Sequence, residues 1–130
     1  MHGEARGTFE VTLQPIGGND GPIGLMSIDK HFHGDLQGHS VGRMLAVRTP
    51  VEGSAGYVAM ERVTATLAGR QGAFTLQHNG VMTRGEPQLS VVVVPDSGSD
   101  GLLGLSGTLH ITLSDGRHEY RLLYALPGPA

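Results

Sequence analysis

The stretch from Tyr57 to Met82 constrains the fold most, because its apolar residues alternate with polar ones. A period of two is typical of β-strands that bury one face. A reversal at Gly69–Gly72 divides the stretch into two strands, with Leu67 expected opposite Phe74. One face is then apolar, whereas the other is lined by Arg62, Thr64, Thr66, Thr75, Gln77, Asn79 and Thr83. The sequence therefore predicts an antiparallel pair of strands with a single buried face.

Two ionisable residues fall on the apolar face of this pair. The expected register places Glu61 opposite Gly80 and Val63 opposite His78, so Glu61 and His78 are diagonal neighbours on adjacent strands. Long side chains at such positions can meet. Burial of a carboxyl group raises its pKa, and a neighbouring imidazole can share its proton. We therefore expect a raised pKa for Glu61.

The Glu61–His78 pair has two interpretations. In the first, Glu61 is a catalytic base or acid and His78 is its partner in an isomerisation, lyase or cyclisation step. In the second, the pair is structural, is completed by Lys30 or Arg62, and fixes the register of the strands. A buried charge is costly, which favours a functional reason for keeping one.

Further alternating segments extend the pattern along the chain, and Gly- and Pro-rich turns separate them. The other expected strands are Gly7–Gln14, Leu25–His33, His39–Arg48, Gln88–Val94, Leu103–Leu113 and His118–Leu126. Pro15–Ile23 and Pro95–Gly101 contain too much Gly and Pro to continue a strand, and we expect loops there.

The final hairpin has the strongest turn signal in the chain. Asp115-Gly116 is typical of a two-residue turn and pairs Ile111 with Tyr120. With this hairpin the sequence predicts eight strands and no helix, and a sheet with one consistently apolar face must close or pack against another. We predict an all-β fold in which residues 1–130 form a single domain, an eight-stranded antiparallel barrel. The alternative is a two-sheet sandwich or jelly roll.

Several residues of the inward-facing parity suit a ligand cavity. Phenol groups can orient a ligand oxygen, and methionines form an adaptable apolar wall. Lys30 also falls on the apolar side, where its long stem could carry the ammonium group to the rim. The expected ligand-binding residues are Lys30, Tyr57, Tyr120, Tyr124, Met44 and Met82. Ordinary core packing is the competing interpretation for the tyrosines and methionines.

The hairpin around Gly34–Gly38 places two charged residues on the outward face. Pairing Phe32 with Ser40 sets Asp29 opposite Arg43. We expect an exposed ion pair there, worth less than about 1 kcal/mol.

Three histidines, His31, His33 and His39, share that outward face and raise the question of a metal site. His-x-His on a strand puts both rings on one side, and a third ring across the turn could complete a cupin-like trio. A cupin pattern also needs a carboxylate a few residues after the second histidine, and only Asp35 follows, inside the turn. We therefore expect surface histidines, no metal and no other cofactor.

Composition narrows the classes of partner. The absence of cysteine excludes disulfides and thiolate chemistry, and nine thinly spread Lys and Arg residues argue against nucleic-acid binding. The N-terminal residues lack the apolar core of a signal peptide, and no apolar run reaches membrane length. We expect a cytoplasmic protein with no membrane partner. The apolar outward residues Val92 and Val94 predict a homo-oligomer.

Four stretches in combination are similar to a known family: GTFEVTL, SIDKHFHGDLQGHSVGRML, GYVAMERVTATLAGRQGAFTLQHNG and VVPDSGSDGLLGLSGTLHI. From Gly7 to about Leu126, the chain resembles a family of small, functionally uncharacterised bacterial proteins, a domain of unknown function with an allene oxide cyclase-like barrel. The resemblance implies an eight-stranded antiparallel barrel and no particular activity. More distant relatives, plant allene oxide cyclases and bacterial cyclases of reactive polyenes, bind hydrophobic substrates in the barrel lumen. No catalytic residue is transferred from them.

These observations together predict a small-molecule-binding β-barrel with a hydrophobic lumen. The leading hypothesis is a cofactor-free isomerase, cyclase or lyase that uses the buried Glu61 and His78. The alternative is a non-catalytic, lipocalin-like binding protein for a hydrophobic ligand. A third class is a structural or interaction protein whose barrel is completely packed.

Overall fold

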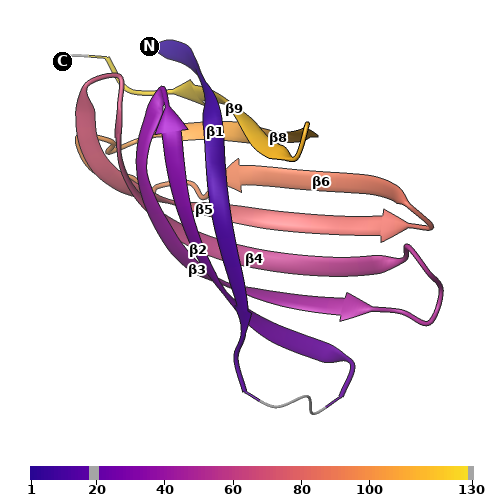
Figure 1. Ribbon diagram of the computed structural model, residues 1–130. Helices are drawn as coiled ribbons and strands as arrows, with labels where there is room; N and C mark the ends of the chain where they lie inside the picture. Colours follow the sequence, from indigo (N-terminus) through magenta and orange to yellow (C-terminus); the bar gives the residue numbers. More distant parts are fainter. Residues whose placement is uncertain (18–20, 129–130) are drawn as a thin grey trace.

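The computed structural model describes residues 1–17 and 21–128, and within them the regular structure consists of β-strands alone (Figure 1). The centre of the predicted loop Pro15–Ile23, residues 18–20, lies outside the described residues. No helix in the described part of the chain is long and apolar enough to cross a membrane. The strands are β1 His2–Pro15, β2 Ile23–Gly34, β3 Leu36–Arg48, β4 Ala55–Leu67, β5 Arg70–Thr83, β6 Glu86–Val93, β7 Ser99–Asp100, β8 Ser106–Ser114 and β9 Arg117–Ala125.

Eight of these strands close into a barrel. Their order is β4-β3-β2-β1-β9-β8-β6-β5, and β5 pairs back with β4. Every pairing is antiparallel. The predicted eight-stranded antiparallel barrel is therefore confirmed. The ninth strand, β7, is a two-residue addition to β5 in the segment where we predicted only a loop.

The register of the central hairpin differs from the prediction. Leu67 lies opposite Arg70 rather than Phe74, a shift of four residues. The cause is the turn, which consists of Ala68 and Gly69, both with positive φ (53° and 76°). Two such residues form the tight turn that matches strand twist, but alanine seldom adopts this conformation. Because the shift is even, every side chain of the hairpin stays on its predicted face.

The hairpin of β2 and β3 is shifted by two residues. Lys30, rather than Phe32, lies opposite Ser40. The inward and outward faces again stay as predicted. The predicted ion pair of Asp29 with Arg43 is wrong, because Asp29 pairs with neighbouring histidines instead. By contrast, the final hairpin has the predicted register.

One end of the barrel is closed by side chains. The start of β1, the end of β9 and the β2–β3 and β4–β5 turns gather at this end (Figure 1), where the Met1 ammonium group donates to the Leu126 carbonyl oxygen at 2.9 Å. Strand β8 begins at Ser106 rather than at the predicted Leu103, because the preceding turn inserts Leu102 and Leu105 into the core. The most deeply buried apolar side chains include Phe32, Leu36, Leu67, Phe74, Leu76, Leu102, Leu105, Leu122 and Leu126.

Candidate functional site

Glu61 lies in the middle of β4 with its side chain completely buried inside the barrel. Its partner across the β3–β4 ladder is Gly42. A methyl group on Gly42 would lie 2.2 Å from the Met60 carbonyl oxygen and 2.9 Å from the Glu61 Cβ atom. The glycine therefore provides the space in which the glutamate turns inward.

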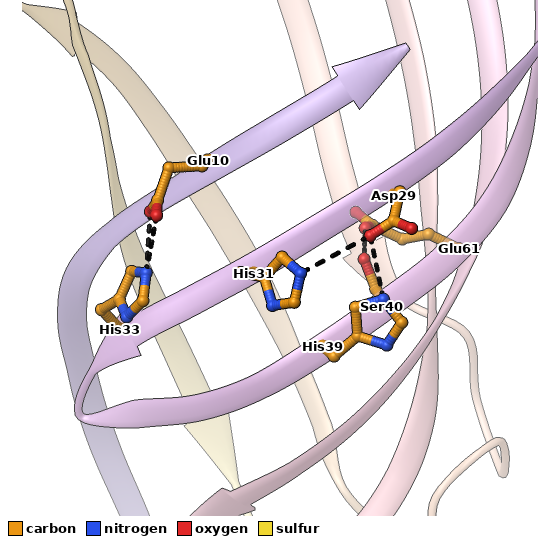
Figure 2. Close-up of polar contacts among 7 residues, drawn as sticks. All are labelled: Glu10, Asp29, His31, His33, His39, Ser40 and Glu61. Carbon is orange, nitrogen blue, oxygen red and sulfur yellow. Dashed lines mark hydrogen bonds and ion pairs between the residues drawn. The ribbon is translucent and has the colours of Figure 1, made fainter. Parts of the chain in front are cut away.

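Three side chains surround the Glu61 carboxylate. The Lys30 ammonium group donates to Oε1 at 2.9 Å, and His78 Nε2 lies 2.6 Å from the same oxygen. The Ser40 hydroxyl donates to Oε2 at 2.5 Å (Figure 2). All four residues are less than 6% exposed. The structure thus brings Glu61 and His78 together as predicted, and Lys30 and Ser40 complete a buried polar cluster.

The Lys30 ammonium group does not reach the rim, as we had expected it could. It lies 4.5 Å from the centre of the Phe9 ring and 5.5 Å from that of Phe32. Cation–π attraction to two rings and an ion pair with Glu61 therefore hold the charge inside the barrel. Neither Ser40 nor Phe9 was among the predicted site residues. Both residues occupy inward-facing positions of the alternating pattern, and this could have identified them from the sequence.

The predicted rise in the Glu61 pKa is wrong in direction. Burial on its own would raise the pKa of this carboxyl group. The hydrogen bond from His78, the coulombic attraction to Lys30 and to the His78 ring, and the hydrogen bond from Ser40 together outweigh burial and lower the pKa to about 2. Glu61 is therefore an ionised carboxylate at neutral pH, held by donors, and not a protonated acid.

The charge on Glu61 selects one tautomer of the neutral His78 ring. An ionised carboxylate only accepts hydrogen bonds, so Nε2 carries the proton in the 2.6 Å contact. Nδ1 is then an unprotonated acceptor in the neutral ring. Among the described residues, the hydrogen bond of the His78 side chain runs through Nε2 to Glu61, and none is formed by Nδ1. The imidazole therefore presents a basic nitrogen that the protein itself does not use.

Above the polar cluster, the lumen contains a cavity of about 470 Å³ that opens at the end opposite the closed one. Lys30 and His78 line this cavity, whereas Glu61 is buried behind them. Of the other predicted residues, Tyr57, Met44 and Met82 also line it. Most of the remaining wall is apolar, with contributions from Phe9, Val11, Leu13, Ile28, Ala46, Ala59, Leu89 and Ile111.

Tyr57 stands beside the polar cluster. Its ring centre lies 6.4 Å from that of His78. Gly80 on β5 faces it, and a methyl group there would lie 2.5 Å from the Tyr57 ring, so the glycine makes room for the phenol. Burial and the negative charge of Glu61 both raise the pKa of Tyr57, which keeps the hydroxyl protonated and able to donate.

Tyr120 and Tyr124 face inward in the opposite half of the barrel and do not line the cavity. The Tyr120 hydroxyl accepts a hydrogen bond from the Leu36 amide at 2.9 Å and lies within hydrogen-bond distance of the His33 and Leu36 carbonyl oxygens. It therefore fastens β9 to the β2–β3 turn. Tyr124 packs against the core.

His118 lines the cavity but was not singled out from the sequence. Its ring stacks on Phe9 with the two ring centres 4.9 Å apart. Its position in the final hairpin, two residues before Tyr120, gives it the inward parity that could have identified it. No hydrogen bond joins His118 to the polar cluster within the described residues.

Fold and site together define a class: a small closed antiparallel barrel that is packed at one end and carries an ion-paired carboxylate beneath an apolar cavity. The chain belongs to the DUF3224 family, because residues 5–124 match the family described as "Protein of unknown function (DUF3224)". This agrees with the resemblance seen in the sequence.

A solved structure from the same family supports the assignment. The crystal structure of a protein of unknown function of the DUF3224 family from Shewanella oneidensis MR-1 matches this chain with a TM-score of 0.92 and 42% sequence identity. The match covers 99% of this chain and 100% of that one. None of the curated proteins matches the chain in sequence.

Proposed function

We propose that the barrel binds an apolar small molecule in its cavity and that His78 transfers a proton within the bound molecule. The observation that carries the proposal is the placement of His78, which lines the cavity while its Nε2 atom lies 2.6 Å from the buried Glu61 carboxylate. An imidazole oriented by a carboxylate is the arrangement that general bases use in many unrelated folds.

The cavity supports a hydrophobic ligand of small-molecule size. Its volume of about 470 Å³ falls within the usual range for ligand pockets, roughly 300–1,000 Å³. Aliphatic, aromatic and methionine side chains form most of the wall, with the polar Lys30 and His78 at the floor. The matching ligand is apolar along its length and carries one oxygen-bearing group, such as a carbonyl or carboxylate, directed to the floor.

The proposed chemistry is a cofactor-free isomerisation, with related cyclase or lyase steps. The ligand for this step carries a carbonyl group and a carbon–carbon double bond separated by one CH2 carbon. His78 Nδ1 accepts a proton from that carbon, the C–H electron pair forms a new C=C bond, and the π electrons of the carbonyl group move onto its oxygen. The Lys30 ammonium group lies at the floor, where it stabilises that negative charge. The carbonyl group then re-forms, the electron pair passes to the far carbon of the original double bond, and the protonated His78 returns the proton there. The double bond has moved next to the carbonyl group, and the reaction needs no other reactant.

In this proposal Glu61 acts through His78 rather than on the ligand. We had expected Glu61 to be the base or acid itself, but its side chain has no exposed surface and lies behind Lys30 and His78. Its carboxylate fixes the imidazole tautomer and stabilises the imidazolium formed during proton transfer. Glu61 is therefore a positioning residue.

The second candidate function is a non-catalytic carrier of lipocalin type. The largely apolar wall favours it, because a storage cavity needs no base. In that case the buried cluster satisfies its own charges, and Lys30 and His78 contribute at most one polar contact to the ligand.

The test begins with native mass spectrometry of the protein purified from its own host, which identifies a co-purified ligand by mass. The protein is then assayed for conversion of that ligand, and His78→Gln is compared with the matched variant His118→Gln. His118 also lines the cavity but has no bond to Glu61. We expect His78→Gln to abolish turnover while affinity changes by less than about tenfold, and His118→Gln to retain turnover.

Two outcomes would decide against catalysis. A wild-type protein that binds the ligand and never converts it is a carrier. Equal turnover by the wild type and His78→Gln would remove His78 from the mechanism.

A further inference from the structure

A second cluster of ionisable side chains lies on the outside of the barrel, away from the cavity. It consists of Asp29 and His31 on β2 and His39 on β3 (Figure 2). His31 and His39 are direct partners across the β2–β3 ladder, and their ring centres are 4.8 Å apart. Asp29 lies two residues before His31, so its side chain leaves the same face of the strand.

The three side chains converge on one point. Asp29 Oδ1 lies 2.9 Å from His39 Nε2 and 3.8 Å from His31 Nε2. One potential ligand atom from each residue lies within 4.8 Å of the others. A tetrahedral zinc ion with bonds of about 2.0–2.2 Å holds its ligand atoms roughly 3.3–3.5 Å apart. The observed separations lie on both sides of that value.

Charge and backbone support favour a cation at this point. In the part of the chain that the structure describes, Asp29 forms ion pairs only with these two imidazoles. The ligands also stand on paired strands of a closed barrel, which fixes their spacing before any ion binds.

We propose that Asp29, His31 and His39 form a binding site for a divalent transition-metal ion on the outer surface of the barrel, with the remaining coordination positions open to water or a further ligand. Two imidazoles and one carboxylate select zinc, nickel or copper over magnesium and calcium, which prefer oxygen ligands. Sequence reasoning dismissed a metal because it looked for the carboxylate after the second histidine, whereas Asp29 precedes the first.

His33 offers an internal control. It lies on the same face of β2 and is similarly exposed, but its Nε2 atom pairs with Glu10 at 2.8 Å instead of facing the Asp29 cluster. If exposed histidines bound metal nonspecifically, His33 would contribute as much to metal affinity as His31 and His39. The proposed site makes it different.

The test is isothermal titration of the full chain with zinc chloride, using the wild type, Asp29→Asn, His31→Gln, His39→Gln and His33→Gln. We expect one equivalent in the wild type, a loss of affinity of more than about tenfold in the first three variants, and a change of less than about twofold in His33→Gln. Magnesium in excess should not compete. Because the substituted side chains are exposed, circular dichroism should show all variants folded.

Cobalt provides a second measurement that does not depend on heat signals. The wild type should give visible absorption bands of a four- or five-coordinate cobalt ion, and His39→Gln should lose them. Unchanged zinc binding in His39→Gln, an equal loss in His33→Gln, or no binding by the wild type would each overturn the site. None of these outcomes bears on the cavity, since His78 and Glu61 remain unaltered in every variant.

Discussion

Glu61 shows how a charge can be kept in an otherwise apolar interior. Its carboxylate has no exposed surface, yet Lys30, His78 and Ser40 supply three donors within 2.9 Å. Desolvation makes a buried ion pair costly to form, and removing one member leaves the other charge uncompensated. The cluster should therefore tolerate joint replacement better than single replacement.

The first prediction follows from that asymmetry. Lys30→Met should lower the free energy of unfolding by about 3–5 kcal/mol, because Glu61 loses the cation 2.9 Å from its carboxylate. The double variant Lys30→Met, Glu61→Gln removes both charges and should recover most of that loss. Urea denaturation of the wild type, both single variants and the double variant measures the coupling. Additive losses would show that the pair contributes no coupling energy.

The second prediction concerns acid. The folded pKa of Glu61 is about 2, against an ordinary value of 4.5, so the unfolded chain takes up the proton first as pH falls. The stabilisation is therefore complete above about pH 4.5, is lost progressively between about pH 4.5 and about pH 2, and amounts to roughly 3 kcal/mol.

Urea denaturation at a series of pH values across that window measures the effect. The double variant Lys30→Met, Glu61→Gln has no titrating group at position 61, and its stability should fall less steeply with acid. Identical slopes for the wild type and the double variant would contradict the lowered pKa.

For individual residues, the sequence predicted which side chains enter the barrel but not the protonation state of Glu61. Parity placed Glu61, His78 and Lys30 inside, and the structure agrees. The sign of the pKa shift depended on how many donors reach the carboxylate. That number follows from the β2–β3 and β3–β4 registers, which bring Lys30 and Ser40 to Glu61.

Among the elements, the hairpins show why faces are easier to predict than partners. An error in register of an even number of residues leaves every side chain on its predicted face. The predicted register of the central hairpin was wrong by four residues, yet every inward residue was predicted correctly as inward. The turn at Ala68 and Gly69 could not be recognised from the sequence, because Ala68 has a φ of 53° and such a position is usually occupied by glycine, asparagine or aspartate. Where Asp115-Gly116 marked the turn plainly, the register was predicted correctly.

The third prediction tests the close approach of β3 to β4. Gly42→Ala places a methyl group 2.2 Å from the Met60 carbonyl oxygen and should destabilise the fold by about 2–3 kcal/mol, because backbone cannot move aside cheaply. Gly24→Ala on β2 is the matched control, since its methyl group would meet nothing nearer than 3.9 Å. Thermal unfolding of both variants gives the comparison, and equal melting temperatures would show that the strands separate readily.

The whole molecule is a barrel with one packed half and one hollow half, a division that period-two patterning does not reveal. Tyr57 and Tyr120 have the same inward parity, yet Tyr57 lines the cavity and Tyr120 fastens a turn at the packed end. What separates them is their position along the barrel axis, which depends on the stagger of all eight strands. Leu102 and Leu105 help to close the packed end from the turn that precedes β8, whereas we had predicted a strand from Leu103 onward.

The fourth prediction concerns association. We expect a homo-oligomer, and the outer face of the barrel exposes several apolar side chains, with Val58 51% and Met60 50% accessible. The originally predicted contact residues, Val92 and Val94, are half-buried within the chain. Light scattering should give a mass above that of one chain, and Val58→Lys should lower it. The control variant Thr64→Lys, on the same face of β4, should leave the mass unchanged. A monomeric wild type would contradict the prediction.

Within the described residues, β6 and β8 share a single residue pair, Val92 with Thr108, whereas the neighbouring ladders run for eight or nine pairs. The ladder partners of the first half of β6, from Glu86 to Ser90, lie on β5 alone. Of the eight junctions between neighbouring strands of the barrel, this one would therefore open with the loss of the fewest ladder pairs, and residues of both β6 and β8 line the cavity beside it.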